Sequence, residues 1–246
     1  MLNRIYSRAK RFLSGTSLPS IVREVRADRL TYLNHAALND LFERVNTIEK
    51  NGGDGILVEA GCALGGSAIV IATAKSTRRP FYVYDVFGMI PPPCEHDGAD
   101  VQERYAVIKS GQSRGLKGDK YYGYEDNLLD RVSENFSRHG VPVEANNVHL
   151  VKGLFQETLR IDRPVALAHV DGDWFESVMT CLQRIEPHLT DDGIFVIDDY
   201  DDWSGCRKAV DQYFSDKHDR YEFVRKARLH IVRKRSGDWR SRAGNA

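Results

Sequence analysis

Residues 55–67 read GILVEAGCALGGS, and this stretch decides the fold class. Its first seven residues are almost continuously apolar, which is typical of a strand buried on both faces of a parallel sheet. The glycines that follow, Gly61, Gly65 and Gly66, permit a tight turn, and Ser67 opens a helical pattern. A strand that passes through a glycine turn into a helix predicts an α/β protein.

The same alternation continues along the chain. Helical patterns separate the apolar runs, so we predict a doubly wound, mostly parallel sheet. Two last β-rich runs, YEFVRK and LHIVRK, are separated by almost nothing and predict a terminal antiparallel hairpin, which brings the sheet to seven strands. The other expected strands are 55–61, 81–86, 148–153, 165–172 and 193–200, and the expected helices are 66–76, 126–139, 175–188 and 204–217.

Two segments fall outside this alternation. Residues 1–50 are expected to form an N-terminal helical extension, because residues 20–50 carry an apolar stripe with helical spacing. Residues 51–246 would then form the main domain. Within it, residues 88–125 form a long insertion rich in Gly, Pro and Tyr, and insertions of this length at a ligand rim commonly act as lids.

Composition excludes several classes of protein. Of 246 residues, 41% are hydrophobic and 28% are charged, which argues against disorder. No run approaches the ~20 apolar residues of a membrane span, and the N-terminus lacks the apolar core of a secretory signal. Four scattered cysteines contain no Cys-x-x-Cys pair, so we expect a reduced, cytoplasmic protein without a zinc cluster.

Charge is distributed unevenly along the chain. Residues 1–30 and 220–246 are basic, whereas the remaining residues carry 19 basic and 31 acidic side chains. Because a nucleic-acid-binding domain usually carries a basic core, we expect no nucleic-acid partner. The basic ends are interpreted as solvated, with contact to an anionic membrane or a partner protein as the alternative.

The ends of the first two strands predict a nucleoside cofactor. Glu59 and Gly61 end the first strand, and Asp85 ends the second, where an acid commonly accepts hydrogen bonds from ribose hydroxyls. The glycine loop has no Lys or Arg to neutralise a pyrophosphate. This set of residues fits S-adenosylmethionine better than NAD, although a plain strand–helix turn would look similar.

Four aspartates follow two later strands. Asp171 and Asp173 stand in HVDGDW, and Asp198 and Asp199 stand in VIDDYDD. If these strands are neighbours, the carboxylates meet at one rim of the sheet, and a hard cation such as Mg²⁺ would relieve their repulsion. The alternative is that each aspartate caps a helix.

The chain resembles the macrocin O-methyltransferase (TylF-like) family of class I S-adenosylmethionine-dependent methyltransferases, which have a Rossmann-like fold. The resemblance runs from about residue 55 to residue 214. One departure is Ala63-Leu64, where many relatives carry Trp-Arg, and the long insertion is another. The matching segments are VEAGCALGGS, YDVFGMIP, VHLVKGLFQETL, HVDGDWFES and VIDDYDDWSGCRKAVDQYF.

The resemblance implies a role for each matching residue. Phe155 and Gln156 would contact the adenine, Asp85 would hold the ribose, and Glu59, Gly61 and Ser67 would line the methionine end of the cofactor. Asp173 would be the general base, with His169 or His96 as substitutes. The implied Mg²⁺ ligands are Asp171, Asp198 and Asp199.

These observations predict a metal-dependent O-methyltransferase that acts on a hydroxyl of a sugar, within a glycan or a glycosylated natural product. Two alternatives remain open, an O-methyltransferase for an aromatic diol and a non-catalytic binding protein with the same fold. The sequence identifies neither the acceptor nor the oligomeric state, and it leaves a homo-oligomer open.

Overall fold

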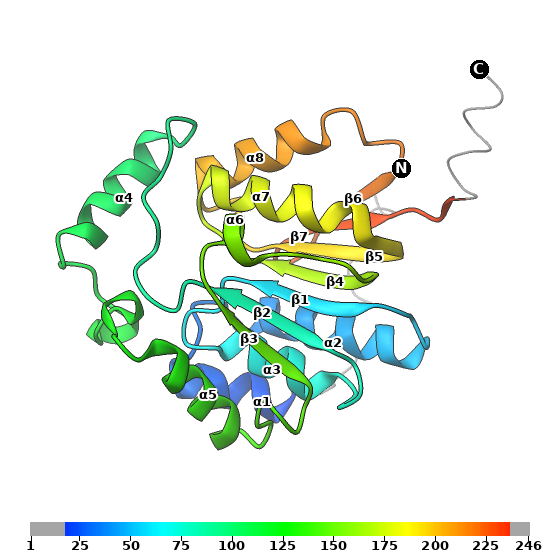
Figure 1. The fold of residues 1–246 in the computed structure, drawn as a ribbon, viewed down its shortest axis with the longest axis horizontal. Helices are drawn as coiled ribbons and strands as arrows, with labels where there is room; N and C mark the ends of the chain where they lie inside the picture. The colour runs from blue at the N-terminus through cyan, green and yellow to red at the C-terminus, as the bar shows by residue number, and fades with distance from the viewer. Residues whose placement is uncertain (1–17, 237–246) are drawn as a thin grey trace, which may run out of the picture.

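The computed structural model describes residues 18–236, which form a seven-stranded sheet with the strand order β3-β2-β1-β4-β5-β7-β6 (Figure 1). β7 pairs antiparallel with both β5 and β6, whereas the pairs among the first five strands are parallel. The predicted fold class is confirmed, including the terminal hairpin. The strands are β1 (Ile56–Ala60), β2 (Phe81–Asp85), β3 (Val148–Lys152), β4 (Val165–Val170), β5 (Leu189–Ile197), β6 (Tyr221–Arg225) and β7 (Leu229–Arg233).

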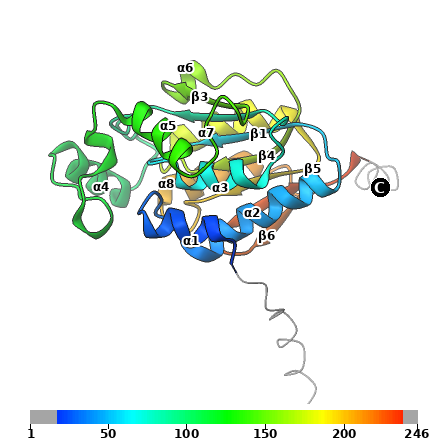
Figure 2. The same ribbon diagram turned by 90° about the horizontal axis from the view of Figure 1, so that it is seen from below.

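Helices cover both faces of the sheet, as the two views in Figures 1 and 2 show. One layer packs the side chains of Leu57, Val83 and Leu167 beneath α1, α2, α3 and α5. The other packs Val58 and Ala168 beneath α7 and α8. The helices are α1 (Ser20–Ala27), α2 (His35–Lys50), α3 (Gly66–Ala74), α4 (Ala99–Lys109), α5 (Leu128–Arg138), α6 (Phe155–Thr158), α7 (Phe175–Ile185) and α8 (Ser204–Phe214).

The described part of the N-terminal extension is two helices, α1 and α2, and both pack against α3. Between them the chain turns, and the Asn34 side chain caps α2 by accepting a hydrogen bond from the Ala37 N–H at 2.9 Å. The same turn reaches the glycine loop, because Gly66 N–H donates to the Leu30 carbonyl at 3.0 Å. The extension therefore contacts the loop at which the cofactor is expected.

The insertion, residues 88–125, is folded rather than open loop, with α4 and two short 3₁₀ turns (Leu116–Gly118 and Tyr122–Tyr124). Its contacts with the starts of α7 and α8 include three hydrogen bonds. The Trp174 indole N–H donates to the Pro91 carbonyl at 3.0 Å, and Asp97 accepts from Phe175 N–H at 2.8 Å. Asp100 accepts from Ser204 N–H at 2.9 Å.

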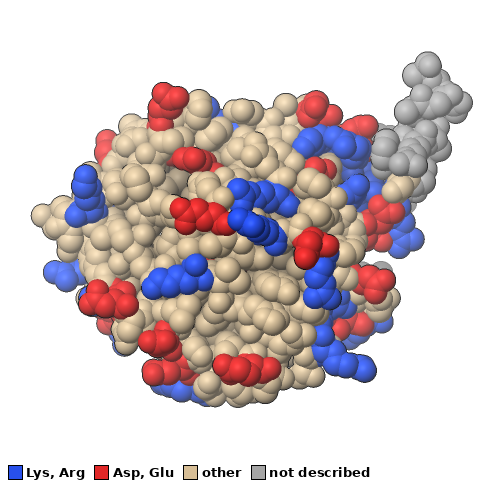
Figure 3. Space-filling view, in the orientation of Figure 1, with Lys and Arg blue, Asp and Glu red and all other residues tan. Residues whose placement is uncertain are grey.

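Charged side chains of both signs are interspersed over the face shown in Figure 3. Basic side chains gather at the edge where the described chain ends, in agreement with the basic bias of the C-terminal part. None of the helices in residues 18–236 combines the length and the apolar character that a bilayer crossing requires.

Three buried polar residues, Glu59, His169 and His230, lie in one line across the sheet. Glu59 on β1 is in register with His169 on β4, and Val196 on β5 is in register with both His169 and His230 on β7. Glu59 Oε1 and His169 Nδ1 are 2.7 Å apart, so these two buried groups satisfy each other in part. Both ring nitrogens of His230 lack a hydrogen-bond partner within residues 18–236.

Replacing Gly61 by alanine should destabilise the fold more than replacing Gly52. Both glycines have a positive φ, but a Cβ on Gly61 would lie 1.9 Å from the Asp171 carbonyl oxygen, whereas one on Gly52 meets nothing within 4 Å. Backbone strain alone predicts a loss of ~1 kcal/mol for Gly52→Ala, and the added clash raises it to ~2–4 kcal/mol for Gly61→Ala. Denaturant unfolding measures both values, and equal losses would contradict the assigned contact.

Acid should destabilise the protein partly through His230. Burial, with the nearby charges of Lys226 and Arg44, lowers the pKa of His230 to about 4. The unfolded chain therefore binds a proton between about pH 6.5 and pH 4 that the folded chain does not, so the free energy of unfolding falls as the pH falls through this window.

The slope assigned to His230 is at most about 1.4 kcal/mol per pH unit. We expect His230→Leu to flatten the curve of unfolding free energy against pH between pH 6.5 and 4. Urea unfolding of both proteins across this window measures the difference, and parallel curves would contradict the assignment.

Candidate functional site

A cavity of about 520 Å³ opens at the carboxyl ends of the strands. Residues at and after the carboxyl ends of all five parallel strands, β1 to β5, line it, as expected for an open α/β sheet. The N-terminal extension contributes Tyr32 to the wall, and the insertion contributes Ile90, Arg104 and Tyr121, among others. Segments far apart in the sequence thus enclose one site.

Asp85 fixes the two loops beside the predicted cofactor site. Its Oδ2 accepts from Cys62 N–H at 2.8 Å, and its Oδ1 accepts from Phe87 N–H at 2.7 Å. Burial raises the pKa of Asp85, and these amide hydrogen bonds oppose the rise. Because each carboxylate oxygen accepts more than one hydrogen bond, Asp85 retains acceptor capacity toward the cavity that it lines.

The other residues predicted to hold the cofactor divide into two groups. Gly61, Phe155 and Gln156 line the cavity together with Asp85. Glu59 and Ser67 are buried and are not among the residues that line it. Glu59 Oε1 faces His169, and its Oε2 is buried without a hydrogen-bond partner in residues 18–236. Direct contact of Glu59 and Ser67 with a cofactor stays a prediction.

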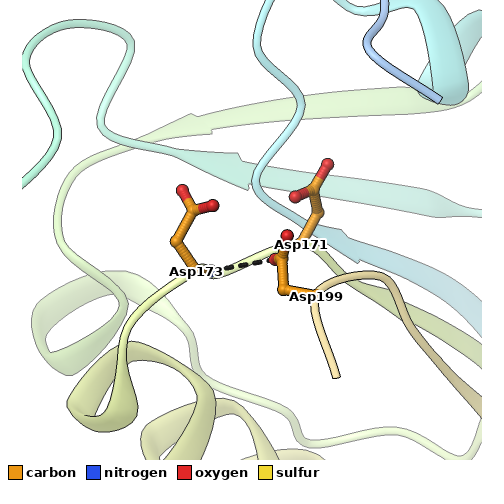
Figure 4. Close-up of side chains that lie close together, drawn as sticks. All are labelled: Asp171, Asp173 and Asp199. Atoms are coloured by element: carbon orange, nitrogen blue, oxygen red, sulfur yellow. Dashed lines mark hydrogen bonds between the residues drawn. The ribbon is translucent and has the colours of Figure 1, made fainter. Parts of the chain in front are cut away.

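Three of the four predicted aspartates form a cluster. Each of Asp171, Asp173 and Asp199 offers a carboxylate oxygen within 4.8 Å of the others. Figure 4 shows the three side chains close together. Asp171 follows β4 and Asp199 follows β5, so the neighbouring strands bring them together. Asp173 N–H donates to Asp199 Oδ2 at 3.0 Å, and Asp173 has a left-handed backbone with φ of 54°. Such conformations often occur at functional sites.

Asp198 lies on the cavity wall but makes different contacts from the cluster. Its Oδ1 accepts from Arg228 Nε at 2.7 Å and lies 3.7 Å from His169 Nε2. Both of these contacts are made by Oδ1 and not by the other oxygen, Oδ2. These cationic neighbours oppose the effect of burial and lower the pKa of Asp198.

The electrostatics of the cluster differ from those of Asp198. Burial, followed by repulsion from neighbouring carboxylates, raises the pKa values of Asp171 and Asp199 well above the usual range. Burial and the charge of Asp198 raise the pKa of Asp173 to about 7, although Arg104 and the Trp203 side chain oppose this. A close group of carboxylate oxygens without a counter-ion of its own is the donor set that a hard divalent cation prefers.

The two histidines considered as substitute bases do not line the cavity. His169 is fully buried between Glu59 and Asp198. The His96 ring packs against Phe175, with ring centroids 4.7 Å apart. Asp173, in contrast, lines the cavity.

Sequence reasoning missed several residues of the cavity wall. Trp203 lies within the stretch VIDDYDDWSG, so its proximity to the aspartates was a usable signal. Nothing in the local sequence marks Tyr32, Arg104 or Arg228, because they reach the cavity from the extension, the insertion and the terminal hairpin. Tyr32, Tyr121, Tyr122, Trp174 and Trp203 give the wall an aromatic character.

The following comparisons with known proteins all involve O-methyltransferases. Residues 23–224 match the family described as macrocin-O-methyltransferase (TylF). The 8-demethyl-8-(2,3-dimethoxy-α-L-rhamnosyl)-tetracenomycin-C 4'-O-methyltransferase of Streptomyces olivaceus is 30% identical over 207 residues, which cover 82% of this chain and 71% of that protein. The demethyldecarbamoylnovobiocin O-methyltransferase of Streptomyces niveus is 28% identical over 198 residues, or 78% and 70% of the two chains.

The solved structure of the O-methyltransferase NovP superposes on this chain with a TM-score of 0.70 at 23% sequence identity. The superposition covers 84% of this chain and 83% of NovP. This superposition supports the fold, whereas the family assignment rests on the family match and on the sequence relatives.

Proposed function

This chain belongs to the macrocin-O-methyltransferase (TylF) family, an S-adenosylmethionine-dependent group of O-methyltransferases, and we propose that it methylates a sugar hydroxyl with the help of Mg²⁺. The observation that carries the proposal is the aspartate cluster beside a cavity with an aromatic wall. The names of the relatives, one of which modifies a rhamnosyl compound, support a sugar acceptor.

The cofactor would occupy the part of the cavity near the glycine loop. Gly61 leaves room for a ligand to approach the backbone, Asp85 would accept hydrogen bonds from the ribose, and Phe155 and Gln156 would contact the adenine. When bound, S-adenosylmethionine supplies the methyl group from its sulfonium centre. Glu59 is buried, and it would lie behind the glycine loop at the methionine end of the cofactor.

The acceptor would occupy the part of the cavity between the aspartates and the aromatic wall. Tyr32, Tyr121 and Trp203 line the cavity, and aromatic rings pack well against the apolar faces of sugars. The methyl transfer is an in-line displacement, so holding the acceptor hydroxyl in one direction supplies a large part of the rate.

The carboxylates fit a divalent cation. Asp171 and Asp199 belong to the cluster, and Asp198 would add its Oδ2, since Arg228 already occupies its Oδ1. When bound, Mg²⁺ supplies a positive charge that lowers the pKa of a coordinated sugar hydroxyl. We assign Asp171, Asp198 and Asp199 as its ligands.

Asp173 is the proposed general base. It lines the cavity beside the ligands, and the hydrogen bond from its backbone N–H to Asp199 fixes its position. A carboxylate held there would accept the hydroxyl proton as the new carbon–oxygen bond forms.

The insertion, residues 88–125, is proposed as a lid on the acceptor side. It contributes Pro91, Arg104 and Tyr122 to the cavity wall and is attached by its contacts to Trp174 and Phe175. Opening of the lid without acceptor stays a prediction. So do the cytoplasmic location, the absence of a nucleic-acid partner and a homo-oligomeric state.

Methyl incorporation from labelled S-adenosylmethionine tests the proposed function. We expect label in sugars or glycosides, loss of labelling in EDTA and recovery with Mg²⁺, because the cation activates the hydroxyl. Phenolic diols belong in the same panel. Labelling of the diols alone would replace the sugar by an aromatic acceptor, and full activity in EDTA would remove the metal from the reaction.

Substitution of the aspartates by asparagine should separate their roles. Asp171→Asn and Asp199→Asn keep the side-chain size but remove charge, so the affinity for Mg²⁺ in calorimetry should fall and excess Mg²⁺ should restore part of the rate. Asp173→Asn should keep the metal affinity and lose about 10²–10⁴-fold in turnover, without rescue by metal.

Asp201→Asn is the matched control, since Asp201 is an exposed member of the same stretch that pairs with Arg225 outside the cavity. Its metal affinity and rate should match those of the unaltered protein. Rescue of Asp173→Asn by Mg²⁺ would make Asp173 a ligand and require another base.

A further inference from the structure

Arg104 on α4 stands in the cavity wall without an acidic partner. It is half-buried, and no carboxylate oxygen in residues 18–236 lies within 4.0 Å of its guanidinium. The other cavity arginine, Arg228, is paired with Asp198 at 2.7 Å. A partly desolvated guanidinium without a counter-ion is costly, so its presence in a ligand cavity favours an anion on the ligand.

The insertion itself holds Arg104 in place. Arg104 Nη2 donates to the Ser113 hydroxyl at 2.9 Å, and the guanidinium carbon lies 5.8 Å from the centroid of the Tyr121 ring. One of the five N–H groups of a guanidinium is thus used by Ser113, and neither partner neutralises the charge. The contacts with Ser113 and Tyr121 therefore orient the guanidinium but do not neutralise its charge.

Arg104 and the proposed base line the same cavity. No contact of 4.0 Å or less joins Arg104 to Asp173. A ligand that fills the cavity would therefore meet both groups.

We propose that Arg104 binds a carboxylate or phosphate group on the acceptor, so that the preferred acceptor is an acidic sugar. This inference rests on the proposed sugar O-methyltransferase function and names the substrate class of the same site. Guanidinium groups match the planar oxygens of carboxylate and phosphate, to which they donate paired hydrogen bonds.

Electrostatics would then orient the acceptor. Arg104 attracts an anionic group, so this group would be held on the side of the cavity that the insertion forms. A hydroxyl on the other side of the sugar ring is left facing Asp173. One unpaired cation in the wall thus selects both the class of sugar and the hydroxyl that is methylated.

The test compares anionic and neutral members of matched pairs. The probes are the methyl glycosides of glucuronic acid and glucose, galacturonic acid and galactose, and mannuronic acid and mannose, with glucose 6-phosphate as the phosphate arm. Binding to the protein loaded with S-adenosylhomocysteine and Mg²⁺ is measured by calorimetry, and methyl transfer is measured with labelled S-adenosylmethionine. A carboxylate or a phosphate preference identifies the anion.

We expect the unaltered protein to favour the anionic member of at least one pair by 10-fold or more. Arg104→Gln should lose about 10- to 100-fold in affinity for that member and much less for the neutral member, as expected for loss of a charge-assisted hydrogen-bonded contact. Arg104→Lys should retain part of the preference. Arg114→Gln, an exposed arginine of the same insertion outside the cavity, is the control and should change neither.

Several results would overturn the inference. One is that the unaltered protein binds no anionic member, or prefers none over its neutral counterpart. Another is that Arg104→Gln lowers the affinity for both members of a pair equally while S-adenosylhomocysteine still binds. Methylation of neutral sugars alone overturns the role of Arg104 and leaves the sugar O-methyltransferase function standing. Methylation of phenolic diols and no sugar overturns the proposed function itself.

Discussion

Two backbone hydrogen bonds position the acidic rim of the sheet, which consists of Asp171, Asp173, Asp198 and Asp199. Asp171 N–H donates to the Ala60 carbonyl and Asp198 N–H donates to the Val170 carbonyl, each at 2.9 Å. The parallel pairing of β1, β4 and β5 therefore continues up to the first acid of each stretch. Because these strands are buried on both faces, their register is firmly set, and the carboxylates are held together in spite of their repulsion.

The fold compensates the charge of only part of this rim. Arg228, from the turn between β6 and β7, neutralises Asp198, while the buried pair of Glu59 and His169 lies directly behind it. The cluster of Asp171, Asp173 and Asp199 has no such internal partner among the described residues. A site that keeps like charges close without compensating them is suited to a cation supplied from solution.

The proposed acceptor side of the cavity is built differently from the proposed cofactor side. The loops after the strands provide Gly61 and Asp85, whereas the extension and the insertion provide Tyr32 and Arg104. The insertion is attached through buried polar contacts such as Asp97 with Phe175 N–H, so its wall residues are held in defined positions. In the proposed function, chemistry and acceptor choice would thus depend on separate parts of the chain, an arrangement that lets one fold serve different acceptors.

The sequence by itself determined the fold class and the seven strands, because buried strands and glycine turns leave strong local patterns. It grouped the four aspartates only on the condition that their strands are neighbours, which the tertiary structure decided for β4 and β5. It also identified Asp85 and Asp171 as rim residues, since strand ends in a parallel sheet share one edge. Only the tertiary structure decided that Asp198 pairs with Arg228, that Glu59 lies behind the site with His169, and that Arg104 faces the cavity unpaired. These contacts join residues far apart in the sequence, and no local pattern of hydrophobicity or spacing encodes which side chains meet across them.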